Sequence, residues 1–351
     1  MSSSNLTAGT VLTLLLLLLL SAGTTAAPLS ICEVPKEYTT SPPLVKGEPV
    51  EIAVDLVVLD IIEIDSVKEF FTLYYTVDLR WQDERLSAEN LGYSLAGCSL
   101  EEEDIWHARI GLLNLQSTNV VYFRDIRVDA HGAVREGWRL QTRLSSDFDV
   151  HDFPFDKQRL MMRVASFGYG PESVRFTEYS GHSSSGEGLD SAGWNIIDLR
   201  LDVDIPPTKA GGSQFSQFGL HIDISRNAGY YIWKFVVPLC FILLMAFSVF
   251  WLDPVSFGNQ IGISTAAVFT LVAFLLGLRQ GMPQVAYLNR MDLLVLSATI
   301  LVFLSLAEVV VVSRLVAQAR EELARRIDWH CRWIYLSIFS YMLYRFFANT
   351  S

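Results

Sequence analysis

Four apolar segments fill the last third of this 351-residue chain. They lie at residues 230–252, 259–279, 291–313 and 330–348. An α-helix rises about 1.5 Å per residue, so each segment is about long enough to cross a hydrocarbon layer of about 30 Å. Residues 229–348 are therefore predicted to form a transmembrane bundle of four helices.

Charge and the N-terminal residues predict the orientation of this bundle. Residues 314–329, between the third and fourth segments, carry four arginines, which favours the cytoplasmic side. Four crossings then leave both termini outside a multi-pass protein of the plasma membrane. The apolar run at residues 11–20 is too short to span and is typical of a secretory signal peptide, so residues 1–27 are predicted to be removed.

Residues 28–228 differ physically from the segments that follow them. They hold 18 Lys and Arg against 32 Asp and Glu, a net charge of -14, whereas residues 229–351 hold 9 against 6. Apolar residues alternate with polar ones, as half-buried strands require. The clearest sets are Val50, Ile52, Val54, Leu56; Trp138, Leu140, Leu144; Ile197, Leu199, Leu201, Val203; and Phe218, Leu220, Ile222, Ile224. This pattern predicts an extracellular antiparallel β-sandwich of immunoglobulin-like architecture.

The sequence argues against several classes of function. It has no His-Glu-x-x-His zinc motif, no Gly-x-Ser-x-Gly nucleophile motif and no glycine-rich phosphate loop. An acidic exported domain does not suit nucleic acid. We therefore predict neither an enzyme nor a bound cofactor or metal.

The second apolar segment carries an unusual stripe. Its residues recur at alternating steps of four and three and so share one helical face, at Gly262, Ala266, Phe269, Ala273, Leu276 and Gln280. Most of this face is small or polar, whereas a lipid-facing stripe would be large and apolar. It fits the wall of a pore. The alternative is close helix packing, because Gly258 and Gly262 form a small-residue packing motif.

One loop resembles the signature loop of a receptor family. Residues 146–160 contain Asp149-Val150, then Phe153-Pro154-Phe155-Asp156 and Gln158, as in the pentameric ligand-gated ion channels of the Cys-loop receptor superfamily. Ser146 and Leu160 stand where most animal members have cysteines, so the chain resembles members that lack this disulfide. Three further segments in the family's order extend the resemblance over nearly the whole chain after residue 27: Trp81-Gln82-Asp83-Glu84-Arg85-Leu86, residues 105–114 and residues 226–238.

The resemblance implies a homopentameric ligand-gated ion channel. Five copies of the second segment would surround one pore. Residues 258–283 align with the second span of acetylcholine receptors without a gap, and Phe269 falls where those receptors carry a ring of Leu, so Phe269 is predicted to form a hydrophobic gate. Asn259 replaces the Glu of cation channels at the inner mouth. The acidic sandwich favours cations, whereas Arg279 near the outer mouth argues the other way.

The resemblance also implies an agonist site between neighbouring subunits. Aromatic faces attract organic cations, and the positions carried over from the family are Phe167, Tyr169, Phe215 and Leu113 on one subunit with Tyr74, Thr76 and Asp78 on the next. Several family aromatics are replaced, so the agonist stays open between a small amine, a proton and a lipid. For each aromatic, core packing is the alternative.

A third set of residues is implied to couple agonist binding to the pore. The family brings together an acid of the first hairpin turn, the Asp of the signature loop and an Arg before the first span, which here are Asp65, Asp156 and Arg226. Phe153, Pro154 and Phe155 of the loop and Pro283 of the link after the second span belong to the same interface. The alternative is three separate surface charges.

The four cysteines and one acid inside an apolar segment remain to be placed. Cys32 and Cys98 both lie in the exported part and either form a disulfide or stay free, whereas Cys240 and Cys331 lie in or at the predicted spans and are expected to be inert. Glu308 is an acid inside the third apolar segment. The alternative to a channel is a non-conducting oligomeric cell-surface receptor, in which the four segments act only as an anchor.

Overall fold

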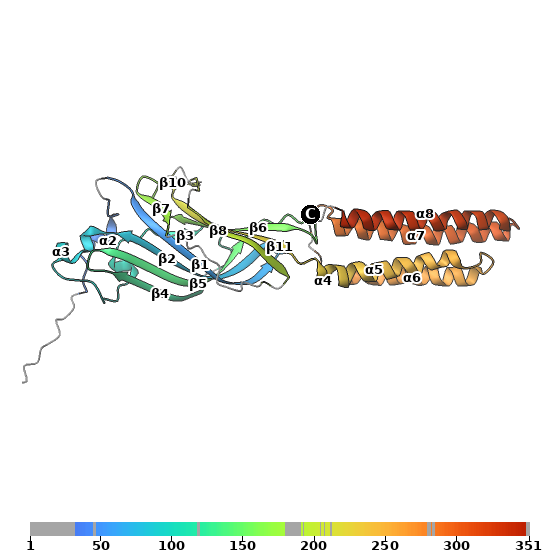
Figure 1. Ribbon diagram of the computed structural model, residues 1–351, viewed down its shortest axis with the longest axis horizontal. Coiled ribbons are helices and arrows are strands. Elements are labelled where there is room, and N and C mark those ends of the chain that lie inside the picture. The colour runs from blue at the N-terminus through green and yellow to red at the C-terminus, as the bar shows by residue number, and fades with distance from the viewer. Residues whose placement is uncertain are drawn as a thin grey trace, which may run out of the picture. The chain divides into compact units, whose positions relative to one another are not determined.

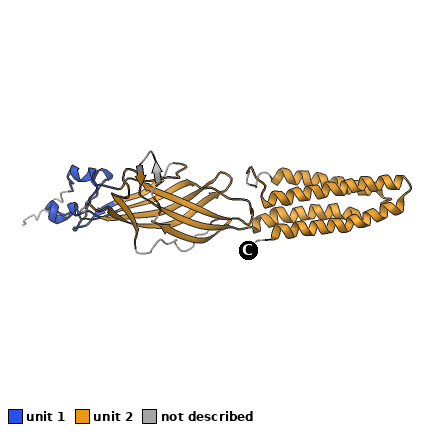
Figure 2. Cartoon of the chain, turned by 90° about the horizontal axis from the view of Figure 1, so that it is seen from above, with its two compact units in different colours: residues 1–43, 82–107, 126–135 blue, residues 44–81, 108–125, 136–351 orange. Residues whose placement is uncertain are grey.

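A computed structural model describes residues 32–44, 47–117, 120–179, 191, 193–203, 205–206, 208–210, 213–278, 282 and 285–348. The predicted signal peptide, Arg279, Gln280 and Pro283 lie outside the described residues. The chain forms two compact units, coloured separately in Figure 2. Unit 1 contains residues 1–43, 82–107 and 126–135, and unit 2 contains the rest.

Two β-sheets form the sandwich. The five-stranded sheet has the order β4-β5-β2-β1-β7, with β1 Val50–Asp65, β2 Phe70–Gln82, β4 Val120–Val128, β5 Ala133–Ser145 and β7 Val174–Glu178. The four-stranded sheet has the order β3-β6-β11-β8, with β3 Ile110–Leu112, β6 Lys157–Ser166, β8 Trp194–Asp202 and β11 Gln217–Arg226. A separate hairpin joins β9 Thr208–Ala210 to β10 Ser213–Phe215. All pairs with a recorded register are antiparallel except β1 with β7. The predicted fold class is confirmed.

The predicted alternation holds in the central strands and fails in one edge strand. Ile52, Val54 and Leu56 of β1 are fully buried, as is the inward set of β11. In β8, however, Ile197 is exposed although the pattern predicted it to face inward. The strand lies at the edge of its sheet, and its pairing with β11 shifts register between Asp223 and Ile224. A register shift exchanges the two faces of a strand.

Four long helical runs follow the sandwich (Figure 1). The first comprises α4 Gly229–Tyr231, a π-helical turn at Ile232–Val236, α5 Val237–Ser248 and a 3₁₀ turn at Val249–Trp251. It is followed by α6 Phe257–Leu278, α7 Arg290–Ala317 and α8 Glu321–Phe347. Among the described residues, Gly229–Trp251, α6 and α7 are long and apolar enough to cross a membrane. The crossing of α8 stays a prediction.

The connection from the third to the fourth helix is shorter than predicted. Residues 314–329 do not form a separate linker, because α7 continues to Ala317 and α8 begins at Glu321. The chain reverses at Ala319, whose φ of 60° is left-handed. The helix α8 therefore includes the charged residues that hydropathy had excluded from the fourth segment.

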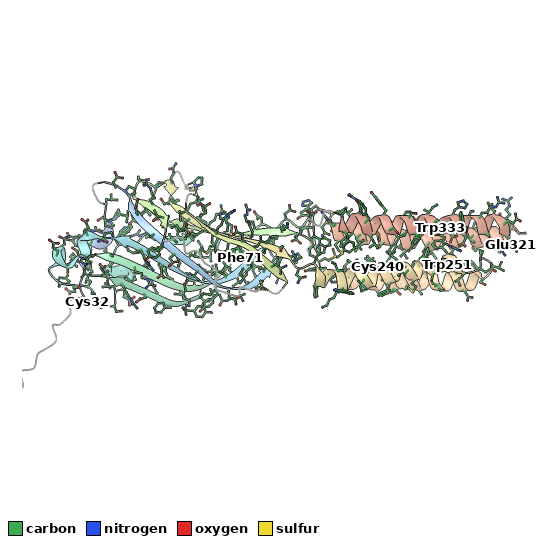
Figure 3. All side chains as sticks on the ribbon, in the orientation of Figure 1. Cys32, Phe71, Cys240, Trp251, Glu321 and Trp333 are labelled. Atoms are coloured by element: carbon green, nitrogen blue, oxygen red, sulfur yellow. A yellow bond between two sulfur atoms is a disulfide. The ribbon has the colours of Figure 1, made fainter. Side chains whose placement is uncertain are left out.

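Two short helices and a disulfide organise unit 1. Arg85 donates to both carboxylate oxygens of Asp83, at 2.9 and 2.8 Å, and to the carbonyl oxygen of Tyr38 at 3.1 Å. These bonds hold α2 Lys36–Thr40 beside the turn that precedes α3 Ala88–Leu91. Cys32, marked in Figure 3, is bonded to Cys98 with a Cα–Cα distance of 5.6 Å. The Trp-x-Asp-x-Arg-Leu motif therefore has a structural role here.

Candidate functional site

In the predicted principal half of the agonist site, the side chain of Phe167 is positioned by its neighbours. The rings of Phe167 and Phe215 are 5.9 Å apart. Phe167 lies against the backbone of Gly111, where a Cβ would come within 2.6 Å of its ring, so a larger residue at position 111 would displace the ring. Its amide donates to the carbonyl oxygen of Arg109 at 2.9 Å, and 44% of the residue stays exposed. The aromatic side chain of Phe167 is thus partly exposed at the surface.

Two further residues predicted for this half lie nearby in the chain. The carbonyl oxygen of Tyr169 accepts from the amide of Ser216 at 3.3 Å, which ties the turn after β6 to the residue after Phe215. Leu113 follows β3, and its amide donates to the carbonyl oxygen of Arg163 at 2.8 Å. Both side chains are half-buried. The backbone bonds explain how β3 and β6 position this half.

The predicted complementary half lies on β2. Tyr74, Thr76 and Asp78 alternate along one face and are all half-buried. Tyr74 meets Tyr122 edge to face at 5.5 Å, and the hydroxyl of Tyr122 donates to Gln141 at 2.7 Å. Tyr122 and Gln141 were not predicted from the sequence. The available signal was the run of four apolar residues at 120–123, which are all exposed in the structure, as at an interface. Because β2 and β6 belong to different sheets, the two halves face different sides of the sandwich.

Asp156 and Arg226 form a buried ion pair. The guanidinium donates from Nε to Oδ1 at 2.7 Å and from Nη2 to Oδ2 at 3.0 Å. The arginine side chain is 5% exposed and the carboxylate 1%. Aromatic rings surround the cation, with Trp194 at 4.1 Å and Phe153 at 4.9 Å from its central carbon. Such a pair is stable only where further groups compensate for lost hydration, and the rings provide that compensation.

Asp65 differs from its predicted role. Its carboxylate accepts from the amides of Val67 and Lys68, both at 2.9 Å, and pairs with the ammonium of Lys68 at 3.3 Å. Burial raises the pKa of Asp65, but these bonds outweigh burial, and the pKa lies below its ordinary value. Arg226 instead reaches the hairpin turn through the hydroxyl of Ser66 at 3.2 Å. The predicted triad is a pair, since a capping role already occupies Asp65.

The signature loop is closed by hydrogen bonds. Gln158 donates from Nε2 to the carbonyl oxygen of Asp149 and to Asp156 Oδ2, both at 2.6 Å, and its Oε1 accepts from the amide of Asp149 at 3.1 Å. Leu160 is fully buried, and the amide of Ser146 donates to the carbonyl oxygen of Glu69. Phe153 and Pro154 are joined by a cis peptide bond. Three of the residues that carry the family resemblance, Asp149, Asp156 and Gln158, are thus hydrogen-bonded to one another.

This loop contacts the helices. The ring of Phe155 lies 5.4 Å from that of Phe346, near the end of α8. Arg290, the first residue of α7, pairs with Asp152 at 2.7 Å and donates to the carbonyl oxygen of Ala348 at 2.8 Å. A single arginine therefore joins the loop, the start of α7 and the end of α8. The sequence reasoning missed Arg290, which has no motif of its own.

The stripe on α6 has the exposure expected of a pore wall. Its five described members are all exposed, with Phe269 at 70% and Leu276 at 65%, and so is Asn259 at the predicted inner mouth; the other three are Gly262, Ala266 and Ala273. The buried residues of α6 lie at other positions, namely Gln260, Ser264, Ala267, Leu271 and Leu278. Helix α6 therefore packs within its own subunit through a different set of residues and leaves the stripe free.

A polar cluster joins the four helical runs at the end where α6 begins. Arg332 of α8 donates to the carbonyl oxygen of Phe250, lies 4.3 Å from the ring of Trp251 and approaches Asp328 at 3.5 Å. Gln260 of α6 donates to the carbonyl oxygen of Leu252. Figure 3 marks Trp251 at this end of the first run. Glu308 of α7 interacts electrostatically with Asp328, and its Oε1 is buried without a hydrogen-bond partner among the described residues.

Comparison with known proteins identifies the two parts of the chain. Residues 36–227 match the neurotransmitter-gated ion-channel ligand binding domain, and residues 235–330 match the neurotransmitter-gated ion-channel transmembrane region. One relative, the gamma-aminobutyric acid receptor subunit beta-4 of Gallus gallus, is 25% identical over 269 residues, which is 75% of this chain and 54% of the relative. The chain thus spans about half the length of that relative.

These matches agree with the described geometry. A sandwich with an open aromatic surface precedes apolar helices, and a buried ion pair and a loop connect the two. Such a chain is a non-enzymatic, multi-pass membrane protein. With family matches over most of its length, this protein belongs to the neurotransmitter-gated ion channel family.

Proposed function

We propose that this protein forms a homopentameric, cation-selective channel of the plasma membrane, opened by an agonist that binds between subunits. Removal of residues 1–27 as a signal peptide would leave both termini outside the cell. The single observation that carries the proposal is the exposed stripe of α6, which a fivefold arrangement would turn toward one axis. Glycine and alanine on this stripe leave space for water, and Phe269 is its largest side chain.

The agonist site would combine the two halves described above. Phe167 and Phe215 of one subunit would face Tyr74, Thr76 and Asp78 of the next. Aromatic faces and a carboxylate suit an ammonium group. Since the relative is a gamma-aminobutyric acid receptor subunit, γ-aminobutyric acid, which carries an ammonium group, belongs in a first agonist screen with simple amines and protons.

The preference for cations rests on the sandwich. The described stripe residues are uncharged, Asn259 at the inner mouth included. Residues 28–228 carry a net charge of -14. Five such domains around a shared entrance would concentrate cations there.

The experiment that tests this function is voltage-clamp recording of cells that express Phe269→Ala. Shortening this ring should let water enter the constriction and produce a standing current without any agonist. Ion substitution then gives the selectivity from the reversal potential. The matched control is Phe274→Ala, the same change five residues along the same helix, where the side chain is half-buried and off the stripe.

Each outcome separates the two candidate functions. A current in Phe269→Ala that Phe274→Ala lacks supports a channel gated at this residue. Surface-exposed Phe269→Ala protein without current would count against a conducting pore. It would favour a non-conducting oligomeric receptor, whose helices serve as an anchor.

A further inference from the structure

Three residues of the signature loop contact the residues around the start of α7. We define the coupling clamp as Val150, His151 and Asp152 of the loop together with Tyr287 and Arg290. The amide of Val150 donates to the hydroxyl of Tyr287 at 3.1 Å, and the amide of Arg290 donates to the carbonyl oxygen of His151 at 3.0 Å. The Asp152–Arg290 ion pair adds a third contact. The loop is therefore bound by three contacts to Tyr287 and to the first residue of α7.

The imidazole of His151 lies between an acid and an aromatic face. Its Nδ1 is 2.6 Å from Asp149 Oδ1, and its ring stacks on that of Tyr287 with a centroid distance of 3.8 Å and an interplanar angle of 7°. The hydrogen bond from His151 lowers the pKa of Asp149, so this carboxylate stays ionised in mild acid. The side chains of His151 and Asp149 are 61% and 77% exposed. Protons in solution therefore reach the ring directly.

We propose that His151 is a proton-binding site that regulates gating, because its protonation tightens the coupling clamp. An imidazolium is attracted by the carboxylate of Asp149 and by the face of Tyr287, and a neutral imidazole is attracted less by both. We therefore expect the contact between His151 and Tyr287 to be tighter in acid than in alkali. The electrical consequence rests on the proposed channel function, whereas the proton-dependent contact does not.

Other charged and polar groups at the clamp come from the loop, from α7 and from α8. From the loop, Asp152 is paired with Arg290 of α7. From α8, Arg345 lines the same groove as Arg290 and keeps its charge. The hydroxyl of Tyr287 is engaged by Val150. Histidine is the residue type whose charge ordinarily changes between about pH 5 and 8, and His151 is the histidine of the clamp.

The test is hydrogen–deuterium exchange of the purified full chain, because two backbone amides report the clamp directly. These are the amides of Val150 and Arg290, measured at pH 5.5 and pH 8 in wild type and His151→Gln. Comparing the two proteins at the same pH removes the chemical effect of pH on exchange. Exposed charge pairs are weak, so we expect the protection of wild type relative to His151→Gln to be about two- to fivefold larger at pH 5.5 than at pH 8.

Two variants make the result specific. Asp149→Asn keeps the imidazole but removes its anionic neighbour, so the gain in protection at pH 5.5 should shrink. His131→Gln changes an exposed histidine of unit 1 and should behave as wild type. Equal protection of wild type and His151→Gln at both pH values would overturn the proposal.

The same inference predicts an electrical effect. In the Phe269→Ala background, lowering the outside pH from 8 to 5.5 should change the standing current by about two- to fivefold, and adding His151→Gln should abolish that change. A standing current that does not change with pH would overturn regulation by His151 but would leave the proposed channel function supported. Absence of any current would count against the proposed channel, and the exchange experiment would still decide the proton site.

Discussion

Among single residues, Arg226 is a cation that contacts several partners at once. Two hydrogen bonds to Asp156, one to Ser66 and the rings of Trp194 and Phe153 surround its guanidinium. Removing one member of a buried pair leaves the other charge without compensation, which costs more than the pair itself contributes. This residue also ends β11 just before the first helical run, so folding and coupling depend on the same contact.

We expect Arg226→Ala to lower the free energy of unfolding by about 3–5 kcal/mol and to abolish gating or assembly. Thermal unfolding of the purified receptor and surface labelling measure the two effects. The matched control is Arg159→Ala, which breaks an exposed pair with Asp223 and should change the stability far less. Normal surface pentamers with normal activation in Arg226→Ala would contradict the assigned role.

Tyr75 offers a test of burial through pH. Burial raises the pKa of Tyr75 to about 12, although the contact with the Thr142 hydroxyl at 3.3 Å opposes the shift. A raised pKa means that the Tyr75 hydroxyl keeps its proton to a higher pH in the folded state than in the unfolded state. The contribution to stability is therefore complete below about pH 10 and is lost as pH rises from about 10 to about 12.

We expect Tyr75→Phe to be less stable than wild type at pH 8 by about 1 kcal/mol, because Thr142 loses its partner. Toward pH 12 wild type should lose about 2–3 kcal/mol that the variant does not. Urea unfolding of both proteins at pH 8 and pH 11.5 measures the change. The same stability difference at both values would refute the burial of this hydroxyl.

At the scale of elements, α6 carries two sets of residues with different surroundings. Ala266 belongs to the exposed stripe, whereas its neighbour Ala267 is fully buried within the subunit. Adjacent helical residues point about 100° apart, so a single step along the chain separates the proposed pore wall from the bundle interior.

We expect a cysteine at Ala266→Cys to react with a water-soluble thiol reagent and a cysteine at Ala267→Cys to resist it. The two variants have the same chemistry and differ only in the direction of the side chain. Reaction rates in a background without Cys240 and Cys331 provide the measurement. Equal rates at the two positions would show that the stripe does not face water.

At the scale of the whole molecule, the chain contains two compact units that depend on different interactions. Unit 1 is small and is joined internally by the Cys32–Cys98 disulfide and by the Arg85 hydrogen bonds. The disulfide closes a loop of 66 residues. In the chain-entropy account, closing a loop of that length stabilises the folded state by about 4 kcal/mol.

We therefore expect Cys32→Ser/Cys98→Ser to make unit 1 sensitive to proteases under conditions in which the remaining sandwich stays intact. Limited proteolysis with mass-spectrometric identification of the cut sites measures this. Cys240→Ser is the control, because this cysteine is a free thiol on α5. Cuts at the same sites and rates in the double variant and in wild type would contradict the stabilising role.

Most correct predictions about the helices and strands came from the pattern of apolar and polar residues along the chain. Helix length follows from apolar run length, and strand faces follow from alternation, because both depend on neighbours in the chain. The stripe of α6 was predicted from spacing alone, and each of its described members is exposed. The extent of α8 was missed because charged residues interrupt the apolar run although the helix continues through them.

The order of an acidic β-sandwich and apolar helices, the family and the residues of the stripe could all be predicted from the chain, since they follow from composition, period and motif order. Which distant groups meet became clear from the folded molecule. It joined Cys32 to Cys98, gave Arg226 the hydroxyl of Ser66 in place of Asp65, and stacked His151 on Tyr287. Such contacts depend on how separate elements pack, and no local pattern of residues encodes that packing.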